Sequence, residues 1–230
     1  MSIRTKVLTV AATLIVIGAA STLGTLPASA ATPACGPGCI SIFSRELGTY
    51  AQPRFVEAVL GGVAQVGQPV ILKAASSSDP SQDLVPRPGL VSDFFAAGMV
   101  SADVNSHYGN LRAAQIEYAP LGVRSGLCVG VATTAFQNEG LTLQPCTVPA
   151  TTVWILDTAD SPGTAAEGYF PIVNGSTTDF SRPFAMHYPR NAEATGEPTP
   201  QIVVRRLQFL SNERTVPDRQ LWGTHFGVLT

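Results

Sequence analysis

Three histidines are the general acid–base candidates in this 230-residue sequence: His107, His187 and His225. His107 lies in the polar, turn-rich stretch Asn105–Asn110, where an acid such as Asp103 would complete a proton-transfer pair. The default for His107 is an exposed loop histidine. His187 and His225 fall in strand-like runs, where a half-buried structural histidine is expected. A secreted enzyme built around His107 is therefore the third and weakest of three functional hypotheses.

Other signatures of catalysis or metal binding are missing from the sequence. It contains no G-x-S-x-G elbow, no phosphate-binding glycine loop and no calcium loop with alternating acids. The acids are scattered, and Asp157 with Asp160, three residues apart, form a weak pair for glycoside hydrolysis. Cys35 and Cys39 are a conceivable metal pair, but no second Cys or His pair lies at ligand spacing. The sequence therefore predicts a non-catalytic protein without a metal or cofactor.

An aromatic residue beside two amides is the best candidate for ligand binding. Phe136, Gln137 and Asn138 are consecutive, and we take them as the tentative ligand-binding residues. An aromatic face stacks on the apolar face of a sugar ring, and the amides hydrogen-bond to its hydroxyl groups. The alternative is that Phe136 covers the core while the amides serve only the turn.

The first thirty residues, 1–30, are typical of a secretory signal peptide. Two basic residues precede the apolar stretch Val7–Ala20, and a small-x-small cleavage site follows before Ala31. The stretch is short for a membrane span, although an uncleaved N-terminal anchor is the alternative. We expect one secreted, extracellular domain over residues 31–230, with no membrane association after cleavage.

Composition narrows the class of protein. The chain is 45% hydrophobic and 13% charged, which excludes disorder and a coiled coil. Its 14 basic and 16 acidic residues are nearly balanced, so no nucleic-acid partner is expected. The Ala-rich, Lys-poor composition with this leader indicates a bacterial protein.

Four cysteines in the exported part suit an oxidising compartment and allow three pairings. Cys35 and Cys39 bracket a Gly-Pro-Gly turn, and Cys128 and Cys146 bracket a hairpin turn near residues 137–140. We predict the two local disulfides.

Short apolar runs separated by Gly, Pro, Asn and Asp predict an all-β sandwich or barrel. The one helix candidate is Gln52–Leu60. A loose repeat of about 69 residues places a large apolar residue two positions after a polar one at Leu84, Trp154 and Trp222.

The segment 126–154 resembles one repeat of the ricin-type β-trefoil lectins. Its paired cysteines, the turn at 138–140 and Trp154 match that family's pattern, and Gln220-Leu221-Trp222 repeats the Q-x-W motif. The resemblance implies a β-trefoil-like barrel of three divergent repeats, here with long insertions at 86–120 and 157–188. It also implies that Leu84, Trp154 and Trp222 are core positions around a pseudo-threefold axis.

Two departures weaken the functional side of the resemblance. The family's sugar-binding Asp is replaced by Gly130, and the Gln of the middle repeat by Thr152. Two hypotheses remain: a secreted protein that binds carbohydrate or polysaccharide, and a protein-interaction or surface-structural module that has lost sugar binding. Whether residues 31–60 belong to the domain stays open.

Overall fold

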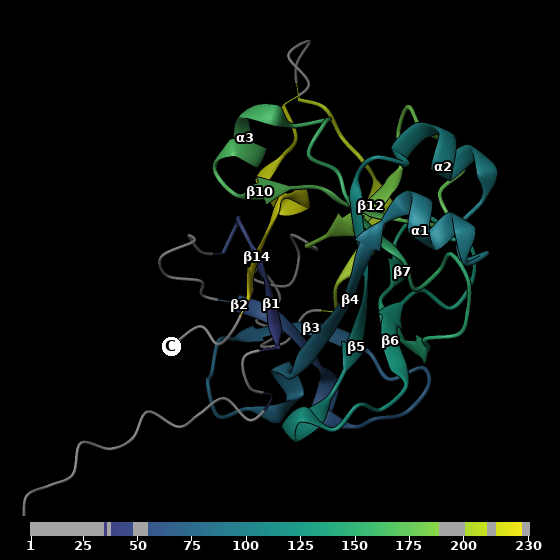
Figure 1. The fold of residues 1–230 in the computed structure, drawn as a ribbon. Coiled ribbons are helices and arrows are strands. Elements are labelled where there is room, and N and C mark those ends of the chain that lie inside the picture. The colour runs from purple at the N-terminus through teal and green to yellow at the C-terminus, as the bar shows by residue number, and fades with distance from the viewer. Residues whose placement is uncertain (1–34, 36–37, 48–54, 189–200, 211–214, 227–230) are drawn as a thin grey trace, which may run out of the picture. The chain divides into compact units, whose positions relative to one another are not determined.

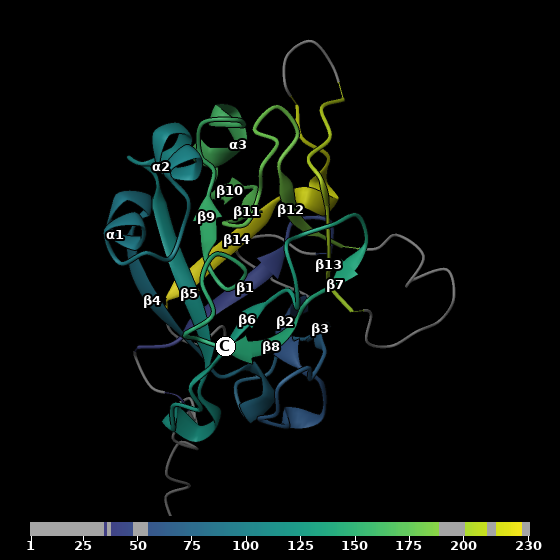
Figure 2. The same ribbon diagram turned by 90° about the vertical axis from the view of Figure 1, so that its right-hand side faces the viewer.

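The computed structural model describes most of the second of two compact units, Ala31–Thr230 (Figures 1 and 2). The residues described are 35, 38–47, 55–188, 201–210 and 215–226. The expected signal peptide lies outside them. No helix in these ranges is long and apolar enough to cross a membrane.

The described chain is mostly β, with short helices between some strands. The strands are β1 (Ile40–Ser44), β2 (Phe55–Val59), β3 (Val70–Ala74), β4 (Leu84–Leu90), β5 (Arg112–Tyr118), β6 (Leu127–Gly130), β7 (Glu139–Gly140), β8 (Thr142–Pro145), β9 (Trp154–Leu156), β10 (Tyr169–Phe170), β11 (Ile172–Asn174), β12 (Phe184–His187), β13 (Val203–Arg206) and β14 (Trp222–Phe226). The helices are α1 (Val91–Ala96), α2 (Ala102–Tyr108) and α3 (Pro162–Ala166), with 3₁₀ turns η1 (Leu60–Gly62), η2 (Pro80–Gln82), η3 (Pro120–Gly122) and η4 (Asp218–Gln220).

All strand pairs among the described residues are antiparallel and belong to one sheet. Its main path runs β10-β14-β1-β4-β5-β9-β11-β12-β13-β7, while β2 and β3 branch from β1, and β6 and β8 branch from β5. This hydrogen-bonded order does not close, so the structure shows an antiparallel sheet and does not by itself show a barrel. The all-β prediction holds in a coarser form, since the described chain is mostly β with three short helices. Helices α1 and α2 lie beside each other in both views, and α3 lies apart from them in Figure 1 (Figures 1 and 2). The segments expected to be insertions carry β4, β5 and β10 to β12, so they supply part of the sheet itself.

The predicted helix Gln52–Leu60 is wrong over its described part, because Phe55–Val59 forms strand β2. The strand pairs with β3 over five residues and contacts β1 at Phe43. Its apolar spacing fits a helix face, but β-branched valines gain more by packing within a sheet. The chain turns directly after β2 at Gly61, where φ is +63°. Strands β1 and β2 also make the start of the domain part of the sheet.

The three repeat positions lie in one apolar cluster. Leu84, Trp154 and Trp222 are each at most 1% exposed. The two indole N–H groups are satisfied in the same way, by a backbone carbonyl of a strand that does not pair with their own. Trp154 Nε1 donates to Val129 O (2.8 Å) and Trp222 Nε1 to Met186 O (3.0 Å).

Two glutamines before these positions make the same pair of bonds. Gln82 Nε2 donates to Ala74 O (2.7 Å), and Gln82 Oε1 accepts from Ser76 N (2.9 Å). Gln220 Nε2 donates to Arg206 O (3.2 Å), and Gln220 Oε1 accepts from Gln208 N (2.9 Å). Each side chain therefore bridges the end of a strand, β3 or β13, to the segment that follows it.

In the middle repeat, different residues make the equivalent hydrogen bonds. Thr152 is too short to bridge the end of β8, and Gln115 on β5 does so instead. Gln115 Nε2 donates to Cys146 O (2.6 Å) and to Thr152 Oγ1 (2.8 Å), and Thr152 Oγ1 donates to Val148 O (2.8 Å). The departure at Thr152 is thus compensated by a residue 37 positions away.

Replacing Gln115 by Leu is expected to lower the free energy of unfolding by about 1–3 kcal/mol, because it leaves the buried Cys146 carbonyl without a donor. Urea denaturation measures this loss. Gln65→Leu, in an exposed loop, is the control with the same chemical change. Equal midpoints for the two variants would show that the bridge contributes nothing.

Candidate functional site

A polar cavity of about 350 Å³ lies beside α2, between that helix, the turn after it and the loop after β9. Ser101 begins the helix, its Oγ accepting from Val104 N (3.2 Å). Val104 and Tyr108, one turn apart, anchor the buried face. On the other side Asp157 Oδ1 accepts the N–H groups of Ala159 and Asp160, both at 3.1 Å, which fixes the loop.

Two polar atoms around this cavity have no hydrogen-bond partner among the described residues. They are Asn105 Oδ1 and Tyr108 Oη. The Asp157 carboxyl lies beside them and interacts with the Asp160 carboxyl. Tyr108 is 3% exposed and Asp157 1% exposed, so bulk water does little to satisfy them. A buried polar group without a partner costs free energy, and here two such groups line a space that a ligand can enter.

Aromatic rings form one side of the site. The His107 ring stacks on Phe180, with centroids 4.8 Å apart, and meets Tyr108 edge-on at 4.5 Å. His107 therefore lines the cavity with its ring already packed against other rings. This arrangement offers a ligand an aromatic edge beside hydrogen-bond acceptors.

Burial and the neighbouring Asp160 carboxylate raise the pKa of Asp157 to about 6. Burial, followed by the charges of Asp157 and Asp160, also raises the pKa of Tyr108 above its ordinary value. At neutral pH Asp157 is therefore mostly ionised, and Tyr108 remains a donor. No Lys or Arg is among the described residues that line the cavity. The site is thus anionic and rich in acceptors.

The structure brings together two segments that the sequence presented separately, the polar stretch around His107 and the Asp157–Asp160 pair. Asp103, suggested above as the partner of His107, is exposed and does not line the cavity. Asn105 had no sequence signal beyond its place in a polar, turn-rich stretch, whereas Tyr108 had one further signal, an aromatic ring able to stack on a sugar.

Phe136, Gln137 and Asn138 lie on another loop, between β6 and β7, and line neither of the two cavities described here. Phe136 is 54% exposed. The amide oxygens are already used, since Gln137 Oε1 accepts from Arg206 N (3.1 Å) and Asn138 Oδ1 from Arg205 Nε. These bonds tie the loop to β13.

The same loop is braced from inside by Glu139, which is 7% exposed. Its carboxylate accepts the backbone N–H groups of Thr133 (3.1 Å) and Phe136 (3.3 Å). Asn138 occupies the left-handed region at φ +66°, which Asn tolerates better than most residues. Phe136 is therefore an exposed aromatic on a well-fixed loop.

Close packing explains why position 130 is a glycine. A Cβ at this position would lie 2.8 Å from Thr151 O and 3.0 Å from Thr152 Cγ2. An Asp cannot occupy position 130 without a shift of the backbone, so the middle repeat has no room for the sugar-binding Asp of the ricin-type pattern.

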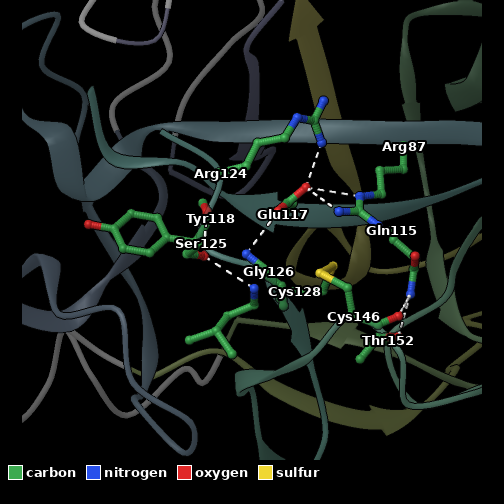
Figure 3. The surroundings of a disulfide bond; sticks show 12 residues. Arg87, Gln115, Glu117, Tyr118, Arg124, Ser125, Gly126, Cys128, Cys146 and Thr152 are labelled. Atoms are coloured by element: carbon green, nitrogen blue, oxygen red, sulfur yellow. Dashed lines mark hydrogen bonds and ion pairs between the residues drawn. A yellow bond between two sulfur atoms is a disulfide. The ribbon is translucent and has the colours of Figure 1, made fainter. Parts of the chain in front are cut away.

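Both predicted disulfides, Cys35–Cys39 and Cys128–Cys146, are present, and no free cysteine remains. The second joins β6 to the residue after β8. Beside it lies the buried Glu117, which receives donors from Arg87, Arg124 and Gly126 (Figure 3). This cluster is a structural support and has no cavity of its own among the described pockets.

The other two histidines lie apart from the polar cavity. His187 on β12 is fully buried, and burial together with the Arg205 and Arg219 charges lowers its pKa to about 3. It is neutral at physiological pH. His225 lies on β14 and pairs across the sheet with Ser41.

Another cavity, of about 420 Å³, is mostly apolar and lies among the strands. Asn110 and Leu111 line both it and the polar cavity, so the two spaces adjoin.

Comparison with known proteins finds similar structures but no similar sequence among family models and curated proteins. No family model and no curated protein matches the sequence. Among solved structures, the chain is similar to the designed threefold-symmetric protein ThreeFoil, with 14% identity, a TM-score of 0.51, and coverage of 81% of this chain and 97% of that one. The two share a fold.

Two natural lectins are also similar. The Rhizoctonia solani agglutinin has 14% identity, a TM-score of 0.46, and coverage of 82% of this chain and 94% of its own. The β-trefoil lectin of the Vibrio vulnificus hemolysin/cytolysin, solved with N-acetyl-D-lactosamine, has 9% identity, a TM-score of 0.45, and coverage of 84% and 97%. The resemblance to ricin-type β-trefoil proteins is confirmed for the fold, and the question of ligand rests on the cavities of this chain.

Proposed function

We propose that this protein is a secreted, non-catalytic carbohydrate-binding protein and that the polar cavity beside α2 is its principal site. The observation that carries the proposal is the buried Asp157 carboxyl, which lies beside a 350 Å³ cavity together with the unpaired Asn105 Oδ1 and Tyr108 Oη. Sugar hydroxyls supply the donors that these acceptors lack, and His107 and Tyr108 offer rings to the apolar face of a sugar. Because the site is anionic, neutral or amino sugars suit it and acidic sugars do not.

The proposal includes a closed β-trefoil barrel as the fold. Strand β10 pairs with β14, and β11 pairs with β9, while Pro171 alone separates β10 from β11. We take residues 169–174 as one strand that completes a six-stranded β-trefoil barrel. Two disulfides support export to an oxidising compartment.

Asp157→Asn is expected to weaken glycan binding at least tenfold, because it removes the charge and places a donor where an acceptor is required. It keeps Oδ1 as acceptor for the loop N–H groups, so folding is retained. A glycan array followed by calorimetry measures the effect, with Asp103→Asn, at an exposed position of α2 that does not line the cavity, as the control with the same chemical change. Binding by the unmodified protein is also expected to weaken as the pH falls through about 6, the pKa of Asp157.

The Phe136 loop is the second candidate site, tested by Phe136→Ala with Asn138→Ala. Loss of binding in this double variant, with Asp157→Asn unchanged, would move the site to that loop. If no glycan bound, the carbohydrate proposal would be refuted. A protein-interaction module is the alternative, favoured by Leu121 and Val123, which are 66% and 69% exposed on the turn after β5.

A further inference from the structure

The second, apolar cavity is built by alternate residues of the six strands proposed to form the barrel. Each strand contributes a pair of residues spaced two apart, the spacing that places side chains on one face of a strand. Gly89, Arg112 and Ala113 of β4 and β5 line the cavity in addition. The pairs are Ile40 and Ile42, Pro86 and Pro88, Ala114 and Ile116, Trp154 and Leu156, Phe170 and Ile172, and Thr224 and Phe226. The cavity is therefore an unfilled part of the interior, about 420 Å³ in volume.

Small residues and prolines explain why this space is unfilled. Ala114 faces Pro88 across β4 and β5 and Trp154 across β5 and β9. Proline has no backbone N–H and a compact side chain, and the described pairing of β1 with β4 is confined to Ile40 and Leu84. Interiors are normally close-packed, so a void of this size is an exception that a ligand would fill.

The cavity has a buried end, its base, and a solvent-exposed end, its mouth. Ile42, Trp154 and Ile172 at the base are each at most 2% exposed. At the mouth Phe226 is 65% exposed, and Arg112, the one charged residue among the described lining, is also exposed. The apolar space thus opens toward polar groups at one end.

That polar end adjoins the proposed sugar site. Asn110 and Leu111 line both cavities, and Asp157 of the polar cavity stands between Leu156 and Thr158 of the apolar one. A molecule seated in the polar cavity and extending past Asn110 would enter the strand interior. Cavities of this size and character are typical of small-molecule sites at the mouths of barrels.

We propose that the ligand is a glycoside with an apolar aglycone, its sugar in the polar cavity and its aglycone between the six strands. This inference rests on the proposed carbohydrate function and adds the class of sugar derivative. A polar cavity that shares its wall with an apolar one matches an amphipathic molecule better than a free sugar.

The test compares methyl and octyl β-glycosides of glucose, galactose and N-acetylglucosamine by calorimetry below micelle-forming concentrations. The sugar head is the same within each pair, so the ratio of affinities reports the aglycone alone. For the sugar that binds, the octyl glycoside is expected to bind at least tenfold more tightly, since each buried methylene adds to affinity. Octyl tetraoxyethylene ether, which has the tail without a sugar, is expected to bind more weakly than the octyl glycoside.

Two variants on different strands fill the apolar cavity, Ala114→Leu on β5 and Thr224→Leu on β14. Each is expected to bring the octyl-to-methyl ratio toward one and to leave the methyl glycoside affinity unchanged. Asp157→Asn should weaken both glycosides alike. Thermal melting checks that the variants fold, and two positions keep the test valid if one fails.

The outcomes separate the two proposals. Methyl glycoside binding with an octyl-to-methyl ratio of one in the unmodified protein would overturn the aglycone inference and leave the carbohydrate function standing. Equal binding of the ether and the octyl glycosides, insensitive to Asp157→Asn, would overturn the glycoside assignment and the sugar site together. No binding by any probe would refute both.

Discussion

Replacing Glu117 by Gln is expected to lower the free energy of unfolding at pH 7 by about 2–3 kcal/mol, because hydrogen bonds to a buried charged group are worth about 1.5–3 kcal/mol each. The Glu117 side chain is 1% exposed. Its Oε2 accepts from Arg87 Nε (2.9 Å), Arg87 Nη2 (2.8 Å) and Arg124 Nη1 (2.5 Å), and its Oε1 accepts from Gly126 N (2.9 Å). The two arginines are half-exposed, so their hydration limits the loss.

The cluster holds the turn between β5 and β6 beside the Cys128–Cys146 disulfide (Figure 3). Glu117 pairs in register with Cys128 across the two strands. The effect is therefore to be measured with the disulfide intact, by urea denaturation without reductant. Glu167→Gln is the control, because Glu167 also pairs with an arginine, Arg45, but is 60% exposed, and such surface pairs contribute only about 0–1 kcal/mol.

The same carboxylate gives a pH signature. Burial alone raises the pKa of Glu117, but hydrogen bonds from Arg124, Gly126 and Arg87 outweigh it, and the pKa is lowered. The folded pKa thus lies below the unfolded one, so the stabilisation is complete above the unfolded pKa, about 4.3, and is lost as the pH falls through the folded value. The difference between the unmodified protein and Glu117→Gln should therefore shrink between pH 5 and pH 3. A difference that stays constant over this range would contradict the role of the charge.

Structural features that depend on residues close together in the sequence could be predicted from local sequence patterns. Both disulfides close short hairpin-like or turn segments, and the pairing Cys128–Cys146 follows from the alternating strands on either side. Leu84, Trp154 and Trp222 could be selected because large apolar residues recur two positions after a polar one at a regular interval. Such signals act within one strand and its turn, which the sequence displays directly.

Structural features that depend on residues far apart in the sequence could not be predicted from such patterns. The spacing of Phe55–Val59 fits a helix as well as a strand, and pairing with β1 and β3 decides between them. Gln115 replaces the missing glutamine at Thr152 from 37 residues away. The polar cavity joins α2 to a loop about fifty residues later, so neither half alone shows an acceptor-rich site.

Replacing Glu57 by Gln is expected to stabilise the protein by about 4 kcal/mol at pH 8 and to leave its stability nearly unchanged at pH 4.5. Glu57 on β2 is 1% exposed, and neither carboxylate oxygen has a hydrogen-bond partner among the described residues. Burial raises its pKa from 4.5 to about 8. Each pH unit between the unfolded and folded pKa values costs about 1.4 kcal/mol, because the unfolded state releases the proton and the folded state retains it.

The sign distinguishes Glu57 from Glu117, since a raised carboxyl pKa makes stability fall as the pH rises from 4.5 toward 8. Glutamine has the shape of the protonated acid and does not titrate, so its variant should lose this slope while matching the unmodified protein at low pH. Thermal melts at half-unit pH steps measure both slopes, with exposed Glu46→Gln as the control for a removed carboxylate. Parallel pH profiles for the unmodified protein and Glu57→Gln would show that Glu57 is ionised in the folded state, held by a donor or by water that reaches β2.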